Sequence, residues 1–151
     1  MRYYPYEEFA KDIKELAKKV GECDAVVAIA RGGLTPAHML AEALDVRDIY
    51  AIRAQSYEDC QKVGKPILSQ VPKIEAKKVV VIDDIVDSGE TMREVMAALS
   101  SQNPKTRFVS AALFYKPTAC YRPDHWLKKA DEWIEFFWTK DVNDTHDRQL
   151  R

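Results

Sequence analysis

The segment that most constrains the fold is residues 79–91, which read Val-Val-Val-Ile-Asp-Asp-Ile-Val-Asp-Ser-Gly-Glu-Thr. Its first four residues are all β-branched, a composition typical of a strand that is buried on both faces. Two carboxylates, Asp83 and Asp84, follow at the expected end of that strand. A short polar loop with Asp87 comes next, and a helical pattern of apolar residues begins at Met92. The segment therefore predicts a strand, a loop and a helix in immediate succession.

The loop in this segment is suited to binding a phosphate group. Backbone N–H groups converge at the start of a helix, and the helix dipole adds about half a positive charge there. The hydroxyl groups of Ser88 and Thr91 supply further donors to phosphate oxygens. The acidic residues just before the loop suit the paired hydroxyls of a ribose and a Mg²⁺ ion. An ordinary turn with an Asp N-cap would explain Asp87 or Ser88 alone, but not the acidic pair.

Residues 79–91 resemble the 5-phosphoribosyl-1-pyrophosphate (PRPP) signature of the type I phosphoribosyltransferases. That signature is a hydrophobic strand, two acids, two apolar residues, Asp, Thr or Ser, Gly, any residue, and Thr. The resemblance implies that Asp83 and Asp84 hold the ribose hydroxyls and Mg²⁺, and that Asp87 acts as the catalytic base. Glu90 departs from the Gly or Lys that is common in relatives, and we expect its side chain to point to solvent. The PRPP-binding residues implied in this segment are Asp83, Asp84, Asp87, Ser88, Gly89, Glu90 and Thr91.

Composition is consistent with one α/β domain that spans residues 1–151. A chain of 151 residues can bury a single core, and its net charge of −1 argues against a nucleic-acid-coating surface. No apolar run reaches the length of a membrane span, and no signal peptide is recognisable. The three cysteines are odd in number and far apart, which favours free thiols in the cytoplasm. By resemblance alone, we expect a homo-oligomer.

The order of expected elements predicts the fold class. Apolar residues with helical spacing occur in 6–20 and 35–44, and short apolar runs typical of strands occur in 25–30, 49–54 and 107–114. Strands that alternate with helices predict a mainly parallel sheet flanked by helices, with ligands at the carboxyl ends of the strands. The aromatic-rich tail contains a further strand candidate near 132–136. The resemblance adds a small C-terminal hood to this α/β fold.

Arg31, Gly32 and Gly33 follow the first core strand and resemble the pyrophosphate loop of the family. Glycine lets the backbone approach diphosphate oxygens closely, although glycine pairs are also common in ordinary turns. In relatives this loop often contains a non-proline cis peptide, which here would be Ala30–Arg31. Arg53, at the end of the next strand, could reach pyrophosphate oxygens with its guanidinium or form a surface ion pair.

Residues 55–70 form a long polar segment between two predicted strands. Ser56 and Tyr57 resemble the start of the mobile catalytic lid of purine phosphoribosyltransferases, and the resemblance places both among the PRPP-binding residues. A lid suits the chemistry, because displacement of pyrophosphate from ribose passes through an oxocarbenium-like state that water would intercept. The alternative is a solvated connector with an incidental tyrosine.

Residues 115–141 resemble the base-binding hood of xanthine-guanine and hypoxanthine phosphoribosyltransferases. The resemblance implies that the Lys116 ammonium donates to the 6-oxo group of the purine and that Trp133 stacks on its ring. Backbone groups around Ile134 and Thr139 would read the Watson–Crick edge. The alternative for the aromatic residues in 133–138 is that they pack in the core, and for Trp138 we favour core packing.

Two hood positions depart from the family pattern. Phe137 stands where relatives usually carry proline, and Thr139 stands where they carry an acid that recognises the 2-amino group of guanine. The preferred 6-oxopurine is therefore open, with Asp141 as a candidate replacement for the acid. The resemblance implies a Mg²⁺-dependent enzyme that converts guanine, xanthine or hypoxanthine and PRPP to the nucleoside monophosphate and pyrophosphate. A transferase with another base acceptor and a non-catalytic nucleotide sensor remain the alternatives.

Overall fold

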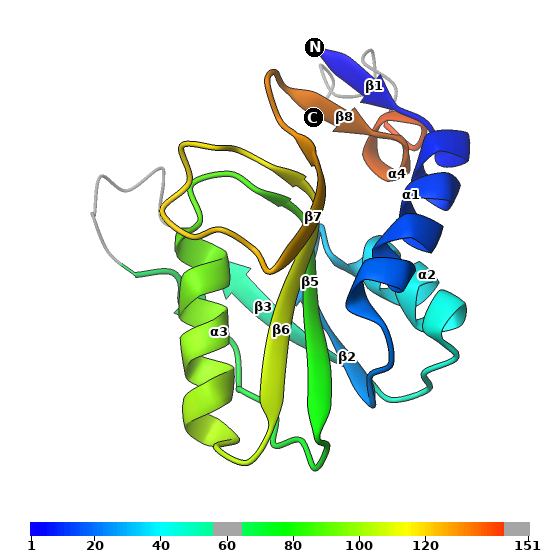
Figure 1. The fold of residues 1–151 in the computed structure, drawn as a ribbon. Coiled ribbons are helices and arrows are strands. Elements are labelled where there is room, and N and C mark those ends of the chain that lie inside the picture. Colours follow the sequence, from blue (N-terminus) through cyan, green and yellow to red (C-terminus); the bar gives the residue numbers. More distant parts are fainter. Residues whose placement is uncertain (56–64, 144–151) are drawn as a thin grey trace.

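The computed structural model describes residues 1–55 and 65–143, and a six-stranded sheet forms the centre of this part of the chain. The strands lie in the order β4-β3-β2-β5-β6-β7, and all of them except β4 are labelled in Figure 1. Every neighbouring pair is parallel except β3 and β4, which are antiparallel. The strands are β2 (Ala25–Ala30), β3 (Ile49–Gln55), β4 (Ile67–Leu68), β5 (Lys78–Val86), β6 (Arg107–Tyr115) and β7 (His125–Lys129). The predicted α/β class with a mainly parallel sheet is confirmed.

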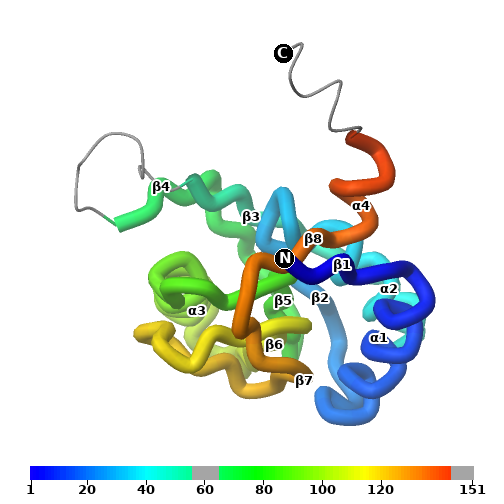
Figure 2. Tube along the Cα trace, turned by 90° about the horizontal axis from the view of Figure 1, so that it is seen from above, coloured from blue at the N-terminus to red at the C-terminus, as the bar shows by residue number. Residues whose placement is uncertain are grey.

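Helices cover both faces of the sheet. Helices α1 (Tyr6–Val20) and α2 (Leu34–Leu44) lie on one face, and α3 (Glu90–Gln102) lies on the other (Figure 2). The side chains of β5 alternate between the two layers: Val80 and Ile82 pack with α1 and α2, whereas Val79 and Val81 pack with α3. The β-branched run is therefore buried on both faces, as its composition predicted.

The hood is a separate two-stranded sheet that lies beyond the carboxyl ends of the central strands (Figure 1). It pairs β1 (Arg2–Tyr4) with β8 (Ile134–Phe136) in parallel, and the short helix α4 (Phe137–Lys140) follows β8. The N-terminal strand was not predicted, because three residues are too few for a recognisable alternation. The hood is thus built from both ends of the chain rather than from the C-terminal segment alone.

Aromatic side chains pack the hood onto the core. The Tyr4 ring makes edge contacts with Phe114 and Phe136, and Phe136 stacks on Trp138 with a centroid separation of 4.7 Å. Trp138 packs against the core, as we expected for this residue.

Most predicted boundaries agree with the structure, but β5 is longer than expected. It continues to Val86, so Asp83 and Asp84 lie within the strand rather than after it. The parallel ladder explains the extension, because β5 stays paired with β6 as far as the Val86–Tyr115 pair. No helix in residues 1–55 or 65–143 is long and apolar enough to cross a membrane.

Candidate active site

The loop between β5 and α3 closes against a second loop that follows β6. Gly89 has φ 90°, a value that favours glycine, and an added Cβ would lie 2.6 Å from the Tyr121 backbone nitrogen. The Ser88 carbonyl accepts a hydrogen bond from the Cys120 N–H at 2.7 Å. Both Asp87 and Ser88 are exposed. The polar loop is therefore fixed through its backbone, which leaves these two side chains available to a ligand.

Asp87 does not act as the N-cap of the following helix. The N-cap residue of α3 is Gly89, and no side chain caps this end. The Ser88 hydroxyl accepts only a long hydrogen bond of 3.3 Å from the Glu90 N–H. Glu90 itself is exposed, and Thr91 is half-buried in the first turn of α3. The structural alternative for Asp87 is thus not observed.

The acidic pair is partly buried and electrostatically unfavourable by itself. Burial raises the pKa of Asp83 well above its ordinary value, and the neighbouring Asp84 carboxylate raises it further. Burial also raises the pKa of Asp84. Asp83 Oδ1 accepts the Asp84 N–H at 2.8 Å, and Asp84 Oδ1 accepts the Ile85 N–H at 2.7 Å. A bound cation would relieve this cost, so the pair is suited to a metal ion or to polarised hydroxyl groups.

These donors fit Mg²⁺ that arrives together with its substrate. Mg²⁺ commonly binds one or two carboxylates and completes its octahedron with water and substrate phosphates. Within residues 1–55 and 65–143 no group of three or more acidic, histidine or cysteine side chains is placed to hold a metal. Two carboxylates are what the described chain offers, and they suit a shared site better than a closed cage.

The glycine loop after β2 lies against the acidic pair. The Ala30–Arg31 peptide is cis, the isomer that the resemblance implied, and Arg31 is exposed. An added Cβ on Gly32 would lie 2.4 Å from Asp84 Oδ2, and one on Gly33 would lie 2.5 Å from the Ile82 carbonyl oxygen. Gly33 therefore requires glycine, because a side chain there would meet backbone atoms, whereas a side chain at position 32 would displace the Asp84 carboxylate.

Arg53 lies on β3, with its side chain exposed. Its backbone N–H donates to Ser69 Oγ at 2.8 Å, and its carbonyl accepts the Ser69 N–H at 2.8 Å. Both bonds join β3 to the segment that follows β4. Ser56 and Tyr57 lie outside the described residues.

A cleft of about 470 Å³ separates the central sheet from the hood. Six of the residues predicted from the sequence line it, namely Asp84, Asp87, Lys116, Trp133, Ile134 and Thr139. Residues that were not predicted also line it, notably Asp131, Glu132, Glu135 and Lys140. All four lie within two residues of Trp133 or Thr139 in the sequence. This proximity was the only available signal, since single charged residues carry no specific pattern.

Asp87 and Lys116 meet on the sheet side of the cleft. Lys116 Nζ lies 3.3 Å from Asp87 Oδ1, and both side chains are more than half exposed. The Lys116 N–H donates to the Val86 carbonyl at 2.9 Å, which joins the ends of β5 and β6. A cation and an anion on adjacent strand ends can therefore contact the same edge of one ligand.

The hood forms the opposite wall of the cleft. Trp133 is 73 % exposed, so its ring is free to stack on a ligand, whereas Ile134 is buried. Asp141 accepts hydrogen bonds from the Tyr3 hydroxyl at 2.7 and 2.9 Å, and it is not among the residues that line the cleft. The structure therefore does not support Asp141 as the replacement for an acid at Thr139.

The sequence matches the phosphoribosyl transferase domain family over residues 2–145. The chain belongs to the phosphoribosyltransferase family. The xanthine-guanine phosphoribosyltransferase of Chromohalobacter salexigens is 30 % identical over 141 residues, which cover 91 % of this chain and 83 % of that protein.

Solved structures agree with this membership. The xanthine-guanine-hypoxanthine phosphoribosyltransferase of Helicobacter pylori superposes with a TM-score of 0.88 at 36 % identity, and the alignment covers 99 % of each chain. The purine phosphoribosyltransferase of Pyrococcus horikoshii gives a TM-score of 0.80 at 27 % identity, over 91 % of this chain and 93 % of that one. The predicted phosphoribosyltransferase fold is thereby confirmed.

Proposed function

We propose that this phosphoribosyltransferase transfers the phosphoribosyl group of PRPP to a 6-oxopurine in purine salvage. The acceptor is guanine, xanthine or hypoxanthine, and the products are the nucleoside 5′-monophosphate and pyrophosphate. The observation that carries the proposal is a cleft that brings Asp84 and Asp87 together with Lys116 and the hood. The named relatives that act on xanthine and guanine support the choice of acceptor.

The phosphate groups of PRPP would bind along the carboxyl edge of the sheet. The loop 87–91 holds the 5′-phosphate through its backbone N–H groups and through the hydroxyls of Ser88 and Thr91. Pyrophosphate lies against the glycine loop, where Arg31 and Arg53 supply positive charge. Ser56 and Tyr57, which lie outside the described residues, would also contribute to PRPP binding.

Asp83 and Asp84 would hold the ribose hydroxyls and Mg²⁺. When bound there, Mg²⁺ would supply positive charge that stabilises the departing pyrophosphate. The two carboxylates fix the sugar beneath the acceptor base, and their raised pKa values favour a cationic or hydrogen-bonding partner.

Asp87 would act as the base at the purine. The bond between C1 of ribose and the pyrophosphate oxygen breaks with its electron pair on oxygen, and N9 of the purine bonds to C1. The proton carried by N7 passes to the Asp87 carboxylate. Atoms O6 and N7 lie on the same edge of a purine, so the adjacent Lys116 can donate to O6 while Asp87 receives the proton.

The hood would orient the ring. Trp133 stacks on one purine face, and backbone groups around Ile134 and Thr139 read the Watson–Crick edge. Because Thr139 is not an acid, the proposal leaves the order of preference among the three bases open.

We further propose that residues 1–151 act as one catalytic domain, in which β1 joins the C-terminal residues of the hood, and that the enzyme is a cytoplasmic homo-oligomer. The odd and dispersed cysteines suit a reducing compartment.

Turnover with PRPP across a panel of bases tests the function. We expect activity with 6-oxopurines, little with adenine, orotate or uracil, and loss of activity when EDTA removes divalent metal. Preference for adenine or a pyrimidine would identify a different transferase. Binding of PRPP without turnover of any base would identify a nucleotide sensor.

A further inference from the structure

The strand that carries the base-binding residues is held in place by the N-terminal strand. The Trp133 carbonyl accepts the Arg2 N–H at 2.8 Å. Arg2 is paired with Ile134, and Tyr4 is paired with Phe136. Any displacement of β1 therefore moves the main chain that faces the cleft.

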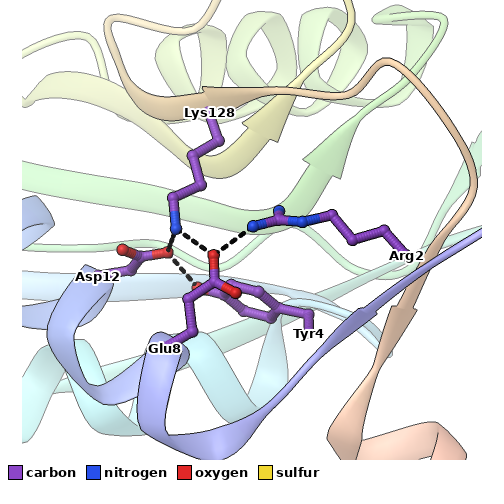
Figure 3. A network of polar contacts seen from close by, with 5 residues as sticks. All are labelled: Arg2, Tyr4, Glu8, Asp12 and Lys128. Atoms are coloured by element: carbon purple, nitrogen blue, oxygen red, sulfur yellow. Dashed lines mark hydrogen bonds and ion pairs between the residues drawn. The ribbon is translucent and has the colours of Figure 1, made fainter.

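A polar network connects β1 to the rest of the molecule (Figure 3). Glu8 Oε2 accepts a hydrogen bond from Arg2 Nη2 at 2.5 Å and another from Lys128 Nζ. Lys128 Nζ also lies 2.8 Å from Asp12 Oδ2, which accepts the Tyr4 hydroxyl at 2.7 Å. One oxygen of Glu8 thus joins the hood strand to helix α1 and to the edge strand β7.

The network is balanced in charge and partly withdrawn from water. It contains two cations and two anions, and the Glu8 side chain is only 25 % exposed. Burial opposes the ionised form of Glu8, but Lys128 and Arg2 outweigh it and lower the pKa of the carboxyl. Partly buried ion pairs depend strongly on geometry, because a displaced charge is neither paired nor fully hydrated.

This network can fix the orientation of β1, but it does not supply the main apolar contact between β1 and the core. The aromatic contacts of Tyr4 with Phe114 and Phe136 already hold β1 against the core. The Arg2 guanidinium lies 5.3 Å from the centroid of the Phe114 ring, two residues before Lys116. None of the five network residues lines the cleft, so an effect on a ligand must pass through the position of the hood.

We propose that Glu8, together with Arg2 and Lys128, is a positioning residue that holds the hood over the cleft and so sets affinity for the purine. The inference rests on the proposed function of the cleft as a base site. It assigns to α1 a role in base binding without contact with the base, and it predicts no effect on the separate phosphate loop.

Glu8→Gln is the variant that tests this role, because it keeps the shape of the side chain and removes its charge. We expect the KM for the purine to rise about tenfold, the effect of one weakened charge-assisted hydrogen bond. The KM for PRPP should change less than about twofold, and kcat should fall little. Glu15→Gln is the matched control: Glu15 lies on the same helix, pairs with Lys18 at 3.3 Å and is 59 % exposed. It should alter neither KM.

A double-mutant cycle with Arg2→Gln separates positioning from general destabilisation. Both changes remove the same contact, so their combined effect on the purine KM should be smaller than the product of the single effects. Thermal unfolding of each variant reports stability independently. Equal increases in both KM values, or a lowered Tm with an unchanged purine KM, would overturn the inference. A wild type that neither binds nor converts a purine would overturn the proposed function as well, whereas an active wild type with an unaltered Glu8→Gln variant overturns only the positioning role.

Discussion

The two walls of the cleft are assembled in opposite ways. The phosphate wall comes from residues 79–91, a contiguous strand, loop and helix start inside the central sheet. The base wall combines Lys116 at the end of β6 with residues of β8, and β1 pairs with β8 without lining the cleft. These segments are far apart in the sequence and are held together by long-range pairing. Chain connectivity fixes the first wall, whereas tertiary contacts must fix the second.

Electrostatics separate the two walls further. On the phosphate wall, burial raises the pKa of Asp83 and Asp84, and the described chain places no cation beside them within ion-pair distance. Glu8 lies outside the cleft and contacts β1 through Arg2; it already has two cationic partners, and these lower the pKa of its carboxyl despite burial. Under the proposed function, ligands would complete the phosphate wall, whereas contacts within the chain stabilise the base wall.

Asp87→Asn should have the largest effect, because Asp87 lies where the two walls meet. General-base groups contribute about 10²- to 10⁴-fold, so kcat should fall within that range. The KM for PRPP and the Tm should change little, since no side chain caps α3 and the variant keeps the size of the loop residue. Steady-state kinetics and thermal unfolding measure both. A fall in kcat of less than about fivefold would withdraw the catalytic role of Asp87.

Lys116→Ala should act on the base wall alone. A purine 6-oxo group that loses its charged donor in the cleft should bind worse, and kcat/KM for the best 6-oxopurine should fall about 100-fold. The KM for PRPP and the weak activity on adenine should hardly change. Lys105→Ala, an exposed lysine at the opposite end of the sheet, serves as the control. An equal loss of kcat/KM with every base would show that Lys116 supports Asp87 and does not distinguish 6-oxopurines from other bases.

Thr91→Ala should act on the phosphate wall alone. Loss of one hydroxyl donor to a charged phosphate should raise the KM for PRPP about tenfold and leave the KM for the purine unchanged. Ser100→Ala, an exposed hydroxyl in the same helix, should alter neither value. An unchanged KM for PRPP in the Thr91 variant would remove Thr91 from the phosphate site.

The contrast between the walls also explains what the sequence could predict. Residues 79–91 predicted their own strand, loop and helix, because strand period, loop polarity and helix start are local properties. The prediction ended β5 too early, since only pairing with β6 keeps Asp83 and Asp84 in the strand. Strand β1 and the contacts of Glu8 were not predictable, because three residues and an ordinary helical glutamate gain their roles only when distant segments meet.

The smallest expected effect is the pH dependence of the base wall. Because the folded-state pKa of Glu8 is lowered, its contribution to stability is fully present above the unfolded value of about 4.3 and is lost as pH falls through the folded pKa. Burial opposes the charge of Lys128, but Asp12 and Glu8 outweigh it and raise its pKa. The Lys128 contribution is therefore present below about pH 10.4 and is lost only as pH rises through the higher folded value.

Between these limits we expect Glu8→Gln to be less stable than wild type by about 1 kcal/mol, typical of a partly exposed ion pair. Thermal unfolding at a series of pH values should show the difference at pH 7 and its disappearance below the folded pKa of Glu8. A difference that is constant down to pH 2 would mean that packing, rather than the charge of Glu8, holds the hood.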